Sequence, residues 1–177
     1  MTTAKVKTSC LTQKIYRLGF GLSPAIALLI IVWGCTATDL NVEAITWTTY
    51  SNSRYGFEFP YPSNWTSLAA PENDDGIGFI APQNNSVEIR GWASHQLPNS
   101  MIKDRESGKN IKPNFQTAQG ISGVLVVEVD RQATSMTLTL TQNQVKYHWQ
   151  GRSNNKEFPN YYRLFYYIAQ QYRIPKS

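Results

Sequence analysis

The 177-residue sequence contains few cysteines, few histidines and few charged residues. It has two cysteines, two histidines and 16% charged residues. Two cysteines exclude a disulfide-rich scaffold, and the composition is neither collagenous nor typical of disorder. The length suits one ordinary domain with its own hydrophobic core. We find no nucleophile-elbow, zinc-protease or phosphate-loop motif, and we therefore expect neither catalytic activity nor a cofactor.

The positive charge of the sequence is concentrated at the N-terminus. The formal net charge is +5, but the first 17 residues contain no acidic residue. Their basic residues are Lys5, Lys7, Lys14 and Arg17. From residue 35 onward, 13 basic residues face 12 acidic ones. A nearly neutral domain lacks the basic patch that nucleic-acid binding requires, so we do not expect a nucleic-acid partner.

An apolar segment follows the basic one. It covers residues 18–33, and residues 25–33 (AIALLIIVW) are apolar without interruption. A basic segment, an apolar segment and a small residue at the end are typical of a secretory signal. The basic part stays on the cytoplasmic side, so the rest of the chain is expected to lie outside the cytoplasm.

The end of this segment resembles the lipobox of bacterial lipoproteins. In VWGC at 32–35, Val32 is the aliphatic residue and Gly34 is the small one, while Trp33 stands where a small or aliphatic residue is usual. The resemblance implies that Cys35 is acylated, as in palmitate-bearing lipoproteins, and that residues 1–34 are removed. Two or more acyl chains suffice for stable membrane anchoring.

An uncleaved membrane anchor and an ordinary signal peptide are the alternative interpretations of the same segment. Its 16 residues are short for a membrane-spanning helix, which needs about 20. In either case residues 35–44 form a short polar tether, and residues 45–177 form a single globular domain.

Most of the domain has the alternating pattern of half-buried β-strands. Pro60 and Pro62 argue against a central strand in their segment. The alternating apolar sets are Phe57 and Phe59; Val87 and Ile89; Leu125, Val127 and Val129; and Met136, Leu138 and Leu140.

The C-terminal segment has a different period. Over residues 158–173 the spacing of four apolar side chains predicts one face of a helix, with Asn160 as its N-terminal cap. Those side chains are Tyr161, Phe165, Ile168 and Tyr172. A further short helix is conceivable at 101–108. The sequence thus predicts an α+β domain, with an antiparallel sheet of about six strands and a C-terminal covering helix.

The segment YSNSRYGFEFPYPSNW at 50–65 resembles the opening of PsbP-like domains. In that family an aromatic–Gly–aromatic strand leads to a Tyr–Pro pair and then to a Trp. The matching residues are Tyr55, Gly56, Phe57, Tyr61, Pro62 and Trp65. The resemblance extends in outline over residues 45–173. It implies the Mog1/PsbP α/β/α sandwich fold and, in a cyanobacterium, a photosystem-associated role at the thylakoid-lumenal face; elsewhere the location would be periplasmic.

Three tyrosines of the predicted helix lie off its apolar face. Tyr162, Tyr166 and Tyr167 either contact a second layer of the domain or provide an interface, since exposed tyrosine adds contact area at low entropic cost. Arg163 lies among them, and Arg152, Lys156 and Arg173 are near in sequence. We expect Tyr162, Arg163, Tyr166 and Tyr167 to bind a partner, such as a membrane protein complex.

Two other groups of residues could bear chemistry. Glu72, Asp74 and Asp75 lie in a PENDDG segment whose spacing does not match a calcium loop, which favours a solvated turn. His95 and His148 have no second ligand at a helical or hairpin interval, and we predict no metal site. The sequence therefore favours a non-catalytic binding or assembly factor; a small envelope enzyme or metal-dependent protein and a structural envelope lipoprotein are the alternatives.

Overall fold

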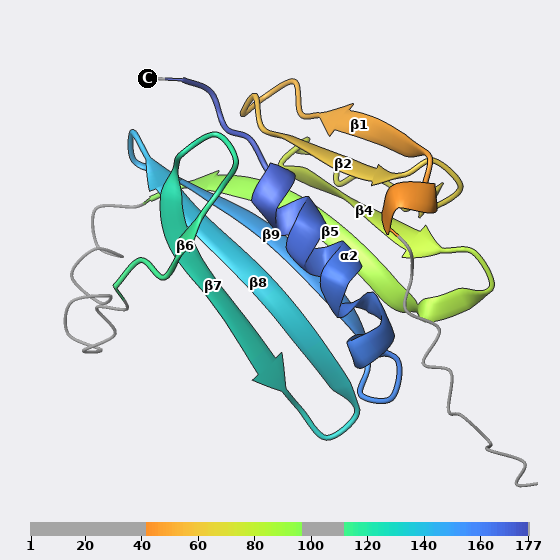
Figure 1. Cartoon of the computed structure of the whole chain (residues 1–177). Helices are drawn as coiled ribbons and strands as arrows, with labels where there is room; N and C mark the ends of the chain where they lie inside the picture. The colour runs from red at the N-terminus through yellow and green to blue at the C-terminus, as the bar shows by residue number, and fades with distance from the viewer. Residues whose placement is uncertain (1–41, 97–111, 177) are drawn as a thin grey trace, which may run out of the picture. The chain divides into compact units, whose positions relative to one another are not determined.

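The structure is a computed structural model that describes residues 42–96 and 112–176 (Figure 1). All of these residues belong to one compact unit, 36–177. Cys35, the predicted export signal and the helix considered at 101–108 lie outside the described residues. No helix in the described part is both long enough and apolar enough to cross a membrane.

The described residues form two antiparallel sheets and one α-helix. The smaller sheet pairs β1 (Trp47–Ser51) with β2 (Glu58–Pro62), after a 3₁₀ turn η1 (Val42–Ala44). In spatial order, the larger sheet contains β3 (Thr66–Ser67), β4 (Gly76–Ala81), β5 (Asn84–His95), β9 (Val145–Asn154), β8 (Ala133–Gln142), β7 (Ser122–Val129) and β6 (Phe115–Gln116). The predicted α+β class is confirmed. The larger sheet has seven strands rather than about six, since β6 is too short to show an alternation.

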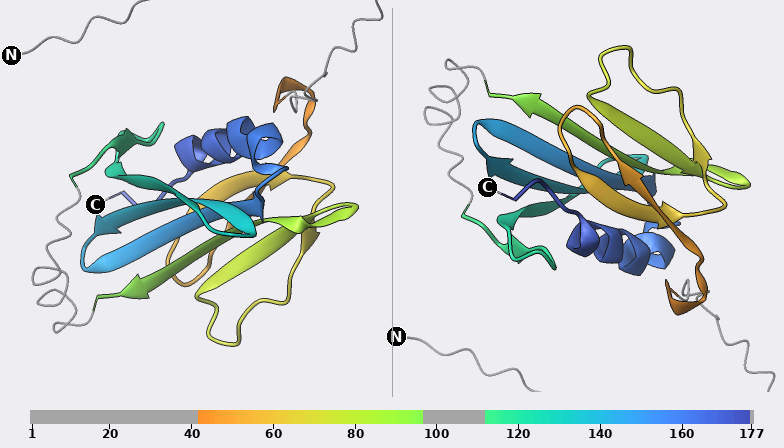
Figure 2. Two further views of the ribbon diagram at one scale, coloured as in Figure 1. Left: turned by 90° about the horizontal axis from the view of Figure 1, so that it is seen from below. Right: turned by 90° about the horizontal axis from the view of Figure 1, so that it is seen from above.

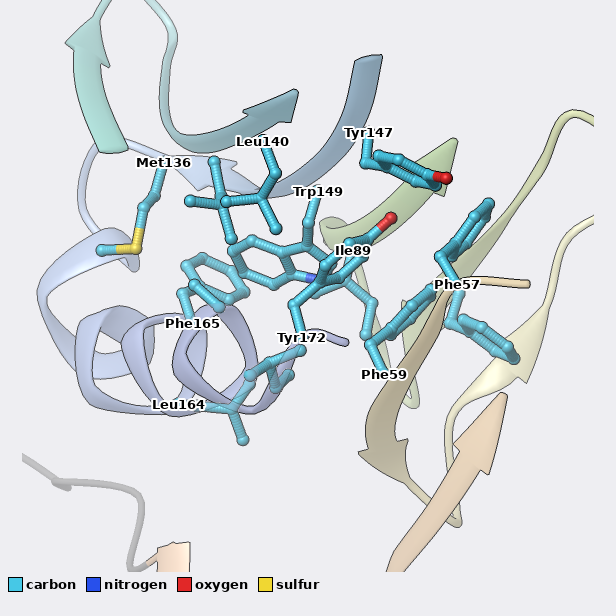
Figure 3. Close-up of a cluster of buried hydrophobic side chains, with 14 of the residues drawn as sticks. Phe57, Phe59, Ile89, Met136, Leu140, Tyr147, Trp149, Leu164, Phe165 and Tyr172 are labelled. Carbon is cyan, nitrogen blue, oxygen red and sulfur yellow. The ribbon is translucent and has the colours of Figure 1, made fainter. Parts of the chain in front are cut away.

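Helix α2 (Phe158–Gln171) lies across β8 and β9 on one face of the larger sheet, and β2 packs beside it (Figures 1 and 2). The inward side chains of the strands meet the helix there, as Figure 3 shows around Trp149 and Phe165. The predicted alternation is confirmed at Met136, Leu138 and Leu140, which are all buried. On the helix, Phe165 and Ile168 are fully buried, as the spacing predicts.

The helix is two residues shorter than predicted, and its N-terminus is capped differently. Glu157 is the N-cap, Pro159 follows in the first turn, and Asn160 lies inside the helix. The preceding loop is held instead by Asn154, whose Oδ1 accepts hydrogen bonds from the backbone N–H of Lys156 (3.1 Å) and Glu157 (2.9 Å). Asn160 is therefore not the cap, because proline at an early helical position moves the start upstream.

The prolines of β2 lie within the strand, on its outer edge. Glu58 exchanges both backbone hydrogen bonds with Arg173, at 2.9 Å each, on the side away from β1. Successive residues of a strand direct their backbone groups to opposite edges, so the nitrogens of Pro60 and Pro62 also face away from β1. No ladder hydrogen bond is lost, which explains why β2 continues to Pro62.

Two glycines allow aromatic rings to approach the sheet closely. A Cβ added at Gly151 of β9 would lie 2.5 Å from the Phe165 ring, and one added at Gly91 of β5 would overlap the Phe59 ring. Each ring occupies the space that the side chain of a residue other than glycine would fill. These contacts fix the positions of α2 and β2 on the sheet.

Candidate partner-binding site

The two sides of α2 differ in exposure. Tyr162 and Tyr166 are 43% and 39% exposed, and their rings lie 6.2 Å apart, one helical turn from each other. The Tyr166 ring meets Phe115 of β6 edge to face at 5.5 Å. The side of the helix toward β6 therefore presents aromatic area to solvent.

Tyr167 lies on the other side of the helix. Its ring is half-buried, 4.8 Å from Trp47 of β1, so the smaller sheet covers it. Arg163 is exposed on the solvent side of α2. The structure thus brings Tyr162 and Tyr166 together and separates Tyr167 from them, because β1 packs against only one side of the helix.

Strand β7 also has two exposed apolar side chains, which the alternating sequence pattern places on one face of the strand. Val127 and Val129 point to the same side of the sheet as Met136, which is opposite Val127 in the register. They are nevertheless 44% and 72% exposed, because α2 crosses β8 and β9 and leaves β7 uncovered. Within residues 42–96 and 112–176, the exposed large apolar or aromatic side chains are Val127, Val129, Tyr162 and Tyr166. Alternation alone could not distinguish these valines from core residues.

The two histidines cannot act as a pair. In the register of β5 and β9, Trp92 lies opposite His148 and His95 lies opposite Val145. His95 shares the face of Ala93, whereas His148 shares the face of Trp92, so the two histidines lie on opposite faces of the sheet. The described part of the chain contains no cluster of three His, Cys, Asp or Glu residues able to hold a metal ion.

His148 is instead packed into the outer face of the sheet. Its ring stacks on Trp92 at 5.0 Å, and its Nδ1 lies 3.1 Å from Thr139 Oγ1. Burial lowers the pKa of His148, and the nearby Lys146 charge lowers it further. The histidine is therefore neutral at pH 7 and contributes to packing.

The acidic segment forms a turn that packs against a neighbouring loop. Asp75 makes an ion pair with Arg54 at 2.6 Å, and Asp74 accepts a hydrogen bond from Ser53 at 2.6 Å. The Asn52 side chain donates to the Asp74 carbonyl at 2.9 Å. These carboxylates are engaged with the loop rather than gathered around a common point, in agreement with a turn.

Two of the surface clefts lie beside tryptophan rings. One, of about 380 Å³, lies beside Trp65 and Tyr161 and has no charged residue in its lining. Another, of about 340 Å³, lies beside Trp92 and includes Asp75 and Arg90. Asp75 is paired with Arg54, and Arg90 with Glu88 at 3.0 Å. Neither cleft brings together an acid, a base and a nucleophile in the way that catalysis requires.

No protein-family model and no curated protein matches the sequence. Among solved structures, the chain is similar to cyanobacterial PsbP (CyanoP) from Synechocystis sp. PCC 6803, with a TM-score of 0.54 and 12% identity over 76% of this chain and 96% of that one. The fold is PsbP-like. A protein from Bacteroides thetaiotaomicron is also similar, with a TM-score of 0.46 and 12% identity over 68% of this chain and 46% of that one. The fold predicted from residues 50–65 is thus confirmed.

Proposed function

We propose that this protein is a membrane-tethered, extracytoplasmic accessory or assembly factor that binds a membrane protein complex through the open side of α2. The exposed pair of Tyr162 and Tyr166 is the observation that supports this proposal most directly. Tyrosine is enriched at interfaces because a rigid ring with a polar end contributes contact area and a hydrogen bond. Arg163, exposed on the same helix, supplies a cation to that surface.

The tether would keep the domain close to the bilayer. Acylation of Cys35 would leave six residues between the lipid-bearing cysteine and Val42, and the seven steps from Cys35 to Val42 span at most about 25 Å. Such anchoring would favour a partner that is itself in or on the membrane. The PsbP-like fold and the resemblance at residues 50–65 favour a photosystem as that partner.

Crosslinking in native membranes tests the binding surface. We expect the wild-type chain to crosslink to subunits of one complex, and the Tyr162→Ala, Tyr166→Ala double variant to lose those products. Thr141→Ala, which alters an exposed side chain on the opposite face of the sheet, is the matched control. If the double variant gave the same crosslinked subunits as wild type, binding through this side of α2 would be refuted.

The lipid anchor is tested separately. Cys35→Ser should abolish acyl labelling and signal processing, which intact-mass measurement of the chain reports. Normal processing of that variant would exclude the lipoprotein assignment, and retention of an unprocessed wild-type chain in the membrane would favour the uncleaved anchor.

A further inference from the structure

Among the residues that the structure describes, no strand pairs with the outer edge of β7 over part of its length. The Asn114 side chain holds both backbone groups of Leu125: its Oδ1 accepts from the Leu125 N–H (2.8 Å), and its Nδ2 donates to the Leu125 carbonyl (2.9 Å). Leu125 therefore directs its backbone groups away from β8. Because alternate residues of a strand face the same edge, Val127 and Val129 direct theirs to that edge too.

In the described part of the chain, β6 covers only the first residues of this edge. It pairs with Ser122 and Gly123, and the Asn114 side chain covers Leu125. On its other edge β7 pairs with β8 from Val124 to Val129. Figure 1 shows β7 at the margin of the described sheet. An open strand edge is a template on which another extended chain can form hydrogen bonds.

The open edge adjoins the exposed side of α2. Asn155, just before the helix, donates from Nδ2 to the carbonyls of Asp130 (2.9 Å) and Arg131 (3.2 Å), which ties the end of β7 to the start of α2. At the other end, Phe115 of β6 contacts Tyr166. We name the surface between these two ties the β7–α2 surface; its residues are Phe115, Val127, Val129, Tyr162 and Tyr166.

We propose that the β7–α2 surface binds an extended segment of another polypeptide, which adds to the sheet antiparallel to β7. This inference rests on the proposed function and names the chemistry of the partner. The segment would exchange backbone hydrogen bonds with Val127 and Val129. Its alternate side chains would be apolar, because residues opposite these valines point to the side of the sheet where Tyr162 and Tyr166 lie.

The size of the surface favours a segment over a second copy of this chain. An exposed apolar patch of this kind covers on the order of a few hundred Å², whereas a stable dimer buries roughly 800 Å² on each partner. Antiparallel pairing of two β7 strands around Val127 would also place Val129 of one copy opposite Leu125 of the other, whose backbone groups Asn114 already holds. A lipid surface offers no matching pattern of donors and acceptors to the edge.

A blocked synthetic peptide, Thr-Val-Thr-Val-Thr-Val, is the probe for this site. We expect the backbone amide signals of Val127 and Val129 to shift on titration and their hydrogen exchange to slow. In antiparallel pairing, the residues opposite the two valines are those whose side chains share their face. N-methylation of the peptide valines should therefore abolish binding, whereas N-methylation of its threonines should preserve it. Equal binding of both N-methylated peptides, or no binding of the parent peptide, would overturn the proposal.

Two matched variants separate this inference from the proposed function. Val129→Lys alters the face toward α2 and should weaken peptide binding by at least about tenfold, whereas Glu128→Lys, on the opposite face of the same strand, should leave it unchanged. Circular dichroism checks that both variants fold. Loss of peptide binding with intact crosslinking through Tyr162 and Tyr166 would refute only the added strand. Intact peptide binding with no crosslinked complex would refute the accessory function.

Discussion

The two sides of α2 have similar residues and different surroundings. On the side toward β1, Tyr167 packs on Trp47; on the side toward β7, Tyr162 and Tyr166 are exposed beside two exposed valines. The helix sequence alone does not separate these tyrosines, because all lie off the buried stripe. The neighbouring strands decide whether a tyrosine stabilises the fold or remains available to a partner.

Gly151→Ala should have the largest effect, because it displaces the helix and so alters both sides at once. The added Cβ would lie 2.5 Å from the Phe165 ring and 2.8 Å from the Trp149 ring. We expect the free energy of unfolding to fall by about 2–3 kcal/mol, the upper part of the typical range for overpacking a core. Chemical denaturation measures it.

Gly120→Asn is the control for this variant. A Cβ at Gly120 meets nothing within 4 Å, and its φ of +88° lies in the left-handed region, where asparagine is better tolerated than other side chains. If Gly151→Ala cost no more than this control, Phe165 would not be seated on Gly151 as described.

A comparison of Trp47→Ala with Tyr162→Ala tests the covered side of α2 against its exposed side. Removal of Trp47 takes away the ring that covers Tyr167, and we expect a loss of roughly 2 kcal/mol in unfolding free energy. Tyr162→Ala removes an exposed ring and should cost less than about 0.5 kcal/mol. Thermal unfolding of both variants measures these losses. Equal losses of unfolding free energy would mean that the two sides of α2 are packed alike.

Tyr172→Phe should increase stability slightly. Tyr172 follows α2 and stacks on Phe57 and on Phe59 of β2, and its buried hydroxyl has no hydrogen-bond partner among the described residues. That burial raises the pKa of Tyr172 well above its ordinary value. Removal of the hydroxyl should raise the unfolding free energy by about 1 kcal/mol, the cost of an unsatisfied buried polar group. A destabilised variant would show that the hydroxyl has a favourable interaction.

The smallest effect should come from the opposite face of the sheet, at His148. Because its pKa is lowered in the folded state, the unfolded chain binds a proton first as the pH falls. His148 therefore does not lower the free energy of unfolding above its ordinary pKa of 6.5. The free energy of unfolding decreases as the pH falls from 6.5 toward the lower pKa of the folded state. Melting temperatures between about pH 7.5 and about pH 5.5 should decline less for His148→Gln than for wild type. Parallel declines would exclude this histidine as a cause.

The sequence could predict elements whose residues carry a strong period. The α+β class, the strand alternation around Leu138 and the buried helix face of Phe165 follow from spacing alone, because burial on one side imposes a period of 2 or 3.6 residues. The opening motif at residues 50–65 further narrows the fold to a PsbP-like one, which the likeness to CyanoP bears out.

The candidate site was less predictable, because it depends on which elements end up adjacent. Val127 and Val129 alternate like core residues, yet no described element covers them. Tyr167 and Tyr166 are sequence neighbours, yet only Tyr167 meets β1. Asn114 precedes a two-residue strand, and nothing in its local sequence indicates that its side chain would hold the backbone of Leu125.

The hydrogen bonds of Asn114 limit both the number of β7 residues that an added segment can pair with and the time for which it stays bound. Its side-chain amide occupies the place of a peptide group, so a segment added to β7 meets an obstacle after only a few residues. Few hydrogen bonds and a small contact area mean fast dissociation, since differences in affinity lie mostly in the off-rate. A short residence time would fit the assembly role proposed above. Asn114→Ala, which frees Leu125, should prolong the lifetime of the peptide complex, as measured by its dissociation rate.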